Sequence, residues 1–173
     1  MNDLIIYSST DGQTKKICET IKDNLPLNDK IKIISLNEAS DINLENSKKI
    51  IIGASIRYGR HSRKVENFVI KNKKILQEKK TAFFSVNVVA RKNEKSTPET
   101  NPYVINFLAK TKWSPNKVAV FAGKVDYPNY NFINKNVIRF IMLITKGPTN
   151  TKNSYEFTNW DMVKKFALEL KLL

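Results

Sequence analysis

The stretch SSTDGQT, at residues 8–14, has the residue types of an anion-binding loop. It follows an apolar run at residues 4–7 and precedes apolar residues at every fourth position from Ile17 to Leu25. This pattern predicts a strand, a turn and an amphipathic helix. Free backbone N–H groups and the positive end of the helix dipole attract anions at such a turn. The stretch therefore favours a phosphate site, although Ser, Thr and Asp are also the preferred N-caps of ordinary helices.

The cysteine and histidine content excludes several kinds of site. Cys18 is the only cysteine, so the chain cannot form an internal disulfide, which fits a reducing compartment. The sequence has no zinc or iron–sulfur ligand spacing. A single histidine, His61, excludes a histidine-rich metal site and disfavours a serine or cysteine triad. We therefore expect no metal centre.

The overall charge indicates the kind of partner. The chain has 30 basic and 16 acidic residues, a net charge of +14, which attracts polyanions, anionic lipid or acidic small molecules. Apolar runs are shorter than the about 18 to 20 residues of a transmembrane helix. The chain also enters a strand almost at once, so we expect no signal peptide.

Apolar runs and helical patterns alternate along the chain, and this alternation predicts the fold. Further strands are expected after the first one, at residues 30–36, 49–56, 81–89 and 117–125. Helices are expected between most of these strands, and a last helix, capped by Thr158, is expected near the C-terminus. Apolar strands separated by helices form a parallel sheet covered on both faces. We expect one α/β domain over residues 1–173, with ligands beyond the carboxyl ends of the strands.

Residues 124–153 do not fit this alternation and form a long insertion around the fifth strand. Within it, residues 131–146 would make a helix about 24 Å long, too short and too charged to span a bilayer. Asn131, Lys135, Arg139 and Lys146 fall near one side, and apolar residues cover most of the rest. This pattern is typical of a helix that lies in the membrane interface. The alternative is a helix packed on the domain or in an oligomer interface.

Four motifs resemble those of a known family. They are YSSTDGQT, IIGASIRYGRH, SVNVVARKNEKSTPETNPY and AGKVDYPNYNF. Over its whole length the chain resembles a flavodoxin-fold protein, and specifically the bacterial quinone-dependent protoporphyrinogen dehydrogenases. The resemblance implies a flavodoxin-like, doubly wound sheet of five parallel strands with FMN at its carboxyl edge. It also implies oxidation of protoporphyrinogen IX to protoporphyrin IX in haem biosynthesis, with electrons passed to a membrane quinone, menaquinone or ubiquinone.

The resemblance assigns the cofactor residues. The flavodoxin phosphate loop, T/S-x-T-G-x-T, falls on residues 9–14, and the expected phosphate contacts are Ser9, Thr10, Gly12, Gln13 and Thr14. Asp11 departs from the pattern, because a carboxylate beside a phosphate is unfavourable. We expect its side chain to turn away, toward a backbone amide of its own loop.

A second flavin loop is expected after the fourth strand. The residues that would bond the flavin ring there are Ser85, Val86, Asn87, Val88 and Arg91. Asn87 is alternatively a turn residue. Tyr58, in the loop after the third strand, would stack on the ring or is an ordinary half-buried aromatic.

The substrate candidates are basic, because a porphyrinogen carries two propionates. Arginine binds a carboxylate through two parallel hydrogen bonds, which favours Arg57, Arg60 and Arg91. His61 is a weaker candidate for a proton acceptor. The alternative for each of them is a solvated basic face.

The expected location is the cytoplasmic side of the bacterial inner membrane, with peripheral attachment to lipid. A homo-oligomer is possible, and no nucleic-acid partner is expected. Two other functions remain open: a flavodoxin-type electron carrier, although such carriers are usually acidic, and a basic nucleic-acid-binding α/β domain.

Overall fold

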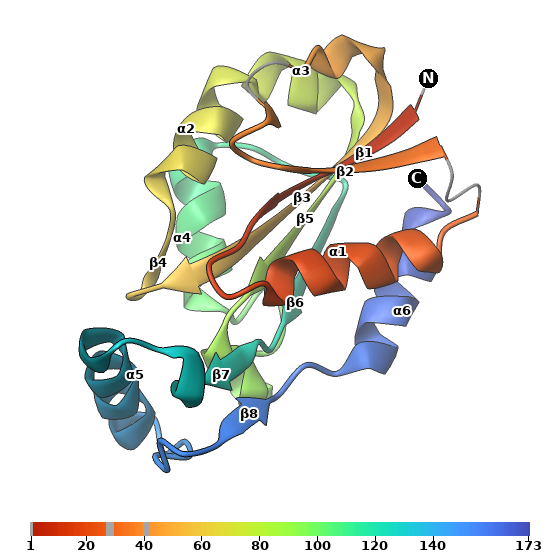
Figure 1. The fold of residues 1–173 in the computed structure, drawn as a ribbon. Coiled ribbons are helices and arrows are strands. Elements are labelled where there is room, and N and C mark those ends of the chain that lie inside the picture. Colours follow the sequence, from red (N-terminus) through yellow and green to blue (C-terminus); the bar gives the residue numbers. More distant parts are fainter. Residues whose placement is uncertain (1, 27–29, 40–41) are drawn as a thin grey trace.

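A parallel sheet forms the centre of the computed structural model, which describes residues 2–26, 30–39 and 42–173 (Figure 1). The strand order is β2-β1-β3-β5-β6. The strands are β1 (Asn2–Ser8), β2 (Ile31–Ser35), β3 (Ser47–Arg57), β5 (Lys80–Val86) and β6 (Lys117–Phe121). This order confirms the predicted flavodoxin-like fold. It places the topological switch point, where the strand order reverses, between β1 and β3. Ligands of such sheets bind beyond the carboxyl ends of the strands at that point.

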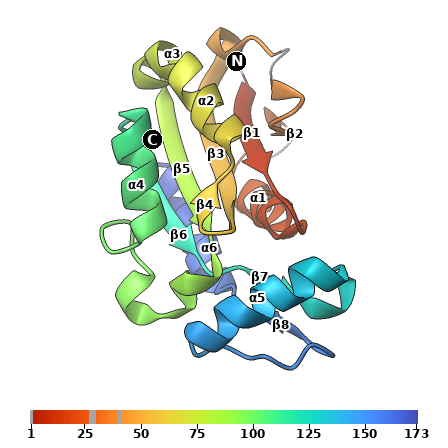
Figure 2. The same ribbon diagram turned by 90° about the vertical axis from the view of Figure 1, so that its left-hand side faces the viewer.

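Helices cover both faces of the sheet. One face carries α1 (Gln13–Asp23) and α6 (Trp160–Leu170), and the other carries α2 (Arg63–Lys71), α3 (Lys73–Glu78) and α4 (Pro102–Thr111), as Figures 1 and 2 show. Successive strand residues point to opposite faces. Ile5 thus packs toward α1 and α6, while Leu4 and Ile6 pack toward the other layer. Both layers are apolar, which explains why the strands read as continuous apolar runs.

All five strand ends differ from the prediction by at least one residue, and three of the differences shape the carboxyl edge. The third strand continues to Arg57 and turns back through Tyr58 and Gly59 into the short strand β4 (Arg60–His61). The fourth strand ends at Val86, because Asn87 caps a 3₁₀ turn, η4 (Val88–Arg91), by accepting from the Ala90 N–H. The fifth strand ends at Phe121, after which the chain leaves the sheet.

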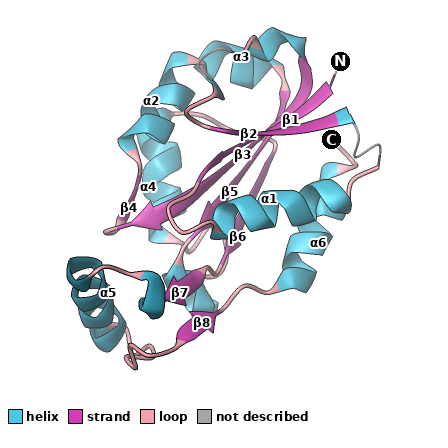
Figure 3. Cartoon of the chain, viewed as in Figure 1, coloured by secondary structure: helices cyan, strands magenta, loops and turns pink. Residues whose placement is uncertain are grey.

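The insertion is an ordered unit beyond the carboxyl edge. Strands β7 (Lys124–Asp126) and β8 (Ser154–Glu156) pair antiparallel, and α5 (Phe132–Ile144) lies between them in sequence (Figure 3). The predicted helix over residues 131–146 is therefore confirmed within two residues at each end. The unit has a small core of its own, in which Val125, Tyr127 and Met142 are buried.

Two further features bear on the predictions. The cap of α6 is Asn159, which accepts from the N–H groups of Asp161 and Met162, so the prediction of Thr158 as the cap is wrong. Thr158 instead donates its hydroxyl to the carbonyl of Ala122. In the described ranges, none of the helices has the length and apolar character needed to cross a membrane.

Candidate functional site

Two adjoining pockets open at the carboxyl edge of the sheet. The first is lined by the loop at residues 9–14 together with the ends of β3 and β5. The second is lined by the turn after β3, by η4 and by the inner side of α5. Both pockets share the residues Asp11, Ile56, Arg57, Asn87, Val88 and Lys124. The arrangement is therefore one elongated site, polar at the loop and largely apolar beneath α5.

The loop at residues 9–14 fits a phosphate group. The buried hydroxyls of Ser9 and Thr14 have no hydrogen-bond partner within the described residues. Burying a hydroxyl without a hydrogen bond costs about 1 to 3 kcal/mol of stability. A bound anion would supply the acceptor that both hydroxyls lack. Gly12, at φ 83°, is the residue before α1, and no atom lies within 4 Å of where its Cβ would be. This leaves open space beside the helix N-terminus, where an anion is stabilised.

Two other residues of the loop have polar side chains with different surroundings. Thr10 is exposed, and its hydroxyl remains a candidate donor. Gln13 is buried, and its amide donates to the Thr158 hydroxyl at 2.9 Å and to Glu156 Oε1 at 3.2 Å. The Gln13 side chain therefore connects the loop to β8 and to the start of α6. Any contact of Gln13 with a phosphate would have to come from its backbone.

Asp11 has partners that the sequence did not indicate. Its Oδ1 accepts from Arg57 Nη1 at 3.1 Å, and its Oδ2 accepts from the Tyr130 hydroxyl at 3.1 Å. The expected bond to a backbone amide of its own loop is wrong, because the carboxylate points to these two side chains. Arg57 comes from β3 and Tyr130 from the insertion. Three separate segments therefore meet at one carboxylate.

Tyr58 lies at the mouth of the second pocket. It adopts φ 50° in the turn after β3 and is 53% exposed. Its hydroxyl donates to Asn134 Oδ1 on α5, and the Arg57 guanidinium lies 5.3 Å from its ring centroid. The ring is thus available at the pocket while its hydroxyl contacts the insertion.

The second loop offers backbone donors rather than the Asn87 side chain. Asn87 Oδ1 accepts from the Ala90 N–H and from Asn101 Nδ2, and its own Nδ2 donates to Ser85 Oγ. Its backbone N–H donates to the Phe121 carbonyl. These contacts favour the alternative of a turn residue. In contrast, the N–H groups of Val88 and Val89 have no acceptor in the described part of the chain, and both residues line the second pocket.

Ser85, Val86 and His61 lie beneath the site. Ser85 is fully buried at the end of β5, and its Oγ is 3.0 Å from His61 Nε2. Val86 packs into the core toward α1 and α6 and borders the first pocket. His61 is 3% exposed, and burial between Phe83 and Phe107 lowers its pKa from 6.5 to about 4. His61 is therefore buried and is not among the residues that line the two pockets, so it does not stand there as a proton acceptor.

We predict that burial of His61 makes the fold sensitive to mild acid. Below pH 6.5 the unfolded chain protonates this histidine, whereas the folded chain does so only near pH 4, so stability falls over this window as pH decreases. Between pH 7.5 and 5.0 the free energy of unfolding should fall by about 2 kcal/mol. Urea unfolding of the wild type and of His61→Gln measures the effect, and the variant should lose less.

Carboxylates with lowered pKa values, Asp126 and Glu38, contribute equally to the wild type and to His61→Gln, so the comparison of the two isolates the histidine. Hydrogen bonds from Lys124 and Ser154 lower the pKa of Asp126 from 3.8 to about 2, so its contribution is lost only below pH 4. If His61→Gln and the wild type lose the same stability between pH 7.5 and 5.0, His61 is not buried as a neutral base.

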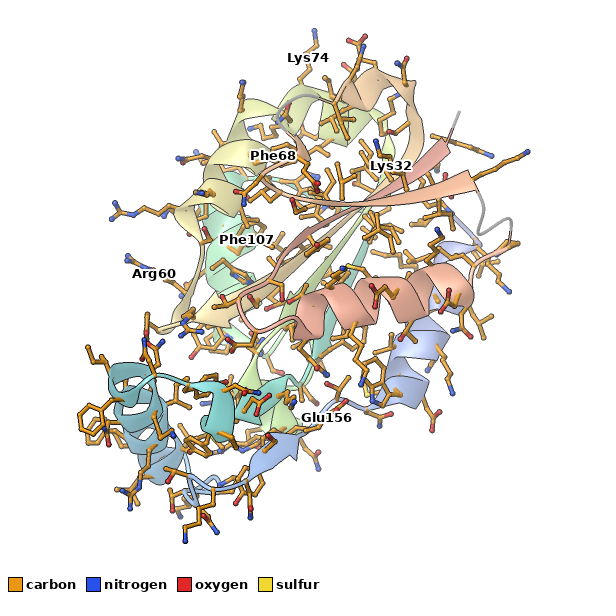
Figure 4. All side chains as sticks on the ribbon, viewed as in Figure 1. Lys32, Arg60, Phe68, Lys74, Phe107 and Glu156 are labelled. Carbon is orange, nitrogen blue, oxygen red and sulfur yellow. The ribbon has the colours of Figure 1, made fainter. Side chains whose placement is uncertain are left out.

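The three arginine candidates occupy different environments. Arg57 is paired with Asp11. Arg91 donates to the carbonyls of Val88 and Thr145 and to the Thr145 hydroxyl, so it connects the second loop to the end of α5. Arg60 is exposed on β4 and has no ion pair within the described residues (Figure 4). Of the three, Arg60 alone has no side-chain partner among the residues that the structure describes.

Sequence reasoning missed the residues that the insertion contributes. Tyr130, Ile138, Ile141 and Met142 all line the second pocket. The available signal was the apolar character of the helix on most of its circumference, since an ordinary surface helix is apolar only on the stripe that faces the core. The inner side of α5 faces the pocket, and the outer side carries exposed apolar residues.

Comparisons with known proteins show the family to which the chain is similar. The flavodoxin domain family matches residues 4–152. A protoporphyrinogen IX dehydrogenase (quinone) from Leishmania major is 40% identical over 172 residues, which cover 98% of this chain and 74% of the relative. The protein of the same name from Escherichia coli strain K12 is 37% identical over 171 residues, covering 98% and 94%. The structure of a flavodoxin from the domain Archaea aligns with a TM-score of 0.54 at 14% identity, over 99% of this chain and 97% of that one, and shows the shared fold.

Proposed function

The chain belongs to the flavodoxin-domain family of quinone-dependent protoporphyrinogen IX dehydrogenases, and we propose on this basis that it oxidises protoporphyrinogen IX to protoporphyrin IX with bound FMN and a quinone as acceptor. The observation that carries the proposal is the elongated site, with two unpaired buried hydroxyls at its polar end and an apolar pocket at the other. A flavin phosphate and a flavin ring require these two environments in this order.

FMN fits the site better than FAD or a nicotinamide dinucleotide. The loop suits a terminal phosphomonoester, and it lacks the GxGxxG turn that binds a pyrophosphate. Ser9, Thr10, Gly12 and Thr14 would hold the phosphate, while Tyr58 and the N–H groups of Val88 and Val89 would contact the ring. When bound, FMN supplies the two-electron redox chemistry that amino-acid side chains lack.

The chain's own residues would exclude water and orient the substrate. Ile138, Ile141 and Met142 cover the second pocket from the insertion side, and Val88 and Val89 border it from η4. A largely apolar tetrapyrrole beside the flavin ring suits this lining. Its propionates would remain at the rim, near the exposed Arg60.

We predict that Arg60→Ala weakens substrate binding and leaves the flavin site intact. A hydrogen bond between charged groups contributes roughly 1.5 to 3 kcal/mol, so KM for protoporphyrinogen IX should rise about 10-fold or more. FMN content and affinity should not change. Arg63→Ala is the matched control, because Arg63 is also exposed but lies in the first turn of α2. Equal KM values for Arg60→Ala and the control would place the Arg60 guanidinium in solvent.

The outer side of α5 supports peripheral attachment to the cytoplasmic face of the inner membrane, where the quinone pool lies. Its exposed apolar side chains, between 62% and 82% exposed, are Phe132, Ile133, Phe140, Leu143 and Ile144. Lys135 and Arg139 flank this apolar side and suit anionic headgroups. A second copy of the chain is the alternative occupant of this face.

The experiment that tests the function is an anaerobic assay. The purified chain is mixed with FMN, protoporphyrinogen IX and a quinone, and protoporphyrin fluorescence and the flavin absorbance are recorded. We expect a flavin spectrum and protoporphyrin formation that depends on both FMN and quinone. A flavin-binding chain that only exchanges electrons with other proteins would support the electron-carrier alternative. A chain that binds no flavin would overturn the proposal and leave the nucleic-acid alternative.

A further inference from the structure

The Asp11 carboxylate connects the phosphate loop to the insertion. It accepts from Arg57 Nη1 and from the Tyr130 hydroxyl, each at 3.1 Å. Tyr130 is itself held in place, because its hydroxyl accepts from the Asp126 N–H at 3.2 Å and its ring packs edge-on against Tyr127. The hydroxyl thus lies at a fixed position against a charged residue of the loop that would hold the FMN phosphate.

An anion in this loop changes the electrostatic situation of Asp11. Two negative groups in adjacent positions repel each other. The Arg57 charge and the Tyr130 hydrogen bond offset that repulsion. Burial raises the pKa of Tyr130 to about 12, so its hydroxyl stays protonated and remains a donor at neutral pH.

The far end of the insertion contacts the same loop. Gln13 donates to Glu156 on β8, and Glu156 also accepts from the indole N–H of Trp160. The insertion is therefore attached to the phosphate loop through Tyr130 near its start and through Glu156 at its end. Its own core contains few buried side chains. Together with the bonds of Tyr58 to Asn134 and of Arg91 to Thr145, these attachments hold it over the pocket.

We propose that Asp11, Arg57 and Tyr130 couple occupation of the phosphate loop to the docking of the insertion over the ring pocket. Tyr130 is then a positioning residue for the flavin phosphate, acting through Asp11. Because coupling between two sites is reciprocal, a bound phosphate stabilises the docked insertion, and the docked insertion strengthens phosphate binding. The inference rests on the proposed FMN site and goes beyond it.

Riboflavin provides the first test, because it has the flavin ring and lacks the phosphate. Hydrogen exchange of the amides in residues 127–146 is measured for the chain alone, saturated with FMN and saturated with riboflavin. We expect FMN to slow exchange in α5 more than riboflavin does. In Tyr130→Phe this difference should disappear. An equal effect of the two flavins on wild-type α5 would overturn the coupling.

Affinity provides the second test. Tyr130→Phe should weaken FMN binding about 10-fold, the effect of a hydrogen bond to a charged group, and leave riboflavin binding unchanged. Asp11→Asn in the same chain should restore most of the loss, because it removes the charge that needs compensation. Tyr155→Phe is the matched control. The Tyr155 ring, like the Tyr130 ring, has its centroid 6.2 Å from that of Tyr127, but its hydroxyl donates to the Asn150 carbonyl.

The outcomes separate this inference from the proposed function. A wild-type chain that does not bind FMN refutes both. The coupling alone is refuted if Tyr130→Phe leaves the affinity for FMN unchanged. It is also refuted if Tyr130→Phe weakens the binding of FMN and of riboflavin by the same factor. If Tyr130→Phe does not fold, Asp11→Asn takes its place in the exchange experiment, where the difference between FMN and riboflavin should shrink. A difference that persists in Asp11→Asn contradicts the inference.

Discussion

Replacing Thr14 by Val should weaken FMN binding about 10- to 100-fold and leave the flavin-free chain at least as stable as the wild type. The Thr14 hydroxyl is buried without a partner in the part of the chain that the structure describes, and its residue is 0% exposed. A bond from this hydroxyl to a charged phosphate contributes roughly 1.5 to 3 kcal/mol, which the variant would lose. Without the ligand, the same hydroxyl is buried without a hydrogen bond and destabilises the fold, so valine should raise the free energy of unfolding by about 1 kcal/mol.

Flavin fluorescence titration measures the affinity, and urea unfolding of the flavin-free chain measures the stability. Thr20→Val is the matched control on the same helix, because the Thr20 hydroxyl already donates to the Lys16 carbonyl. Thr14→Val is a cleaner probe than a change at Gly12, where φ 83° would strain any side chain. A Thr14→Val chain that loses stability and binds FMN normally would show that the hydroxyl has a role inside the fold.

Placing two charges on the outer side of α5 should release the chain from membranes. Phe140→Asp with Leu143→Asp removes two exposed apolar side chains, each contributing about 1.5 to 3 kcal/mol when buried. Binding to anionic vesicles should therefore fall about 100-fold or more. Ile141 is unsuitable for this test because it lines the pocket. Co-sedimentation with anionic and neutral vesicles at low and high salt measures the binding, and salt should weaken the wild-type interaction.

Ile105→Asp with Leu168→Asp is the control for this experiment, because it adds the same two charges at exposed apolar positions on α4 and α6. It should leave sedimentation unchanged. A wild type that ignores anionic vesicles at low salt contradicts the membrane proposal. If the wild type is also a dimer that the double variant separates, the outer side of α5 is an interface between copies.

Local sequence patterns were sufficient to predict the fold, and they indicated the loop between β1 and α1 as a candidate anion site. The apolar runs that contain Ile5 and Ile51 predicted strands buried on both faces, because burial on two faces requires apolar side chains at every position. The glycine and hydroxyl residues between β1 and α1 predicted an anion site, because a helix N-terminus presents its donors without help from distant residues. Both properties depend on residues that are neighbours in the chain. The helix within residues 131–146 was predictable for the same reason.

The tertiary structure decided which charged and polar side chains are available to a ligand. Arg57 and Arg91 looked equivalent to Arg60 in the sequence, but they have internal partners, Asp11 for the first and the end of α5 for the second. Those partners are 46 and 54 residues away along the chain, and Tyr130 is 119 residues from Asp11. Hydrogen bonds require approach within about 3 Å, and the pattern of residue types does not encode which distant segments come that close. The sequence by itself therefore determined the sheet, the loop between β1 and α1 and the insertion helix, whereas only the packing of the insertion against the carboxyl edge decided which residues line the pockets.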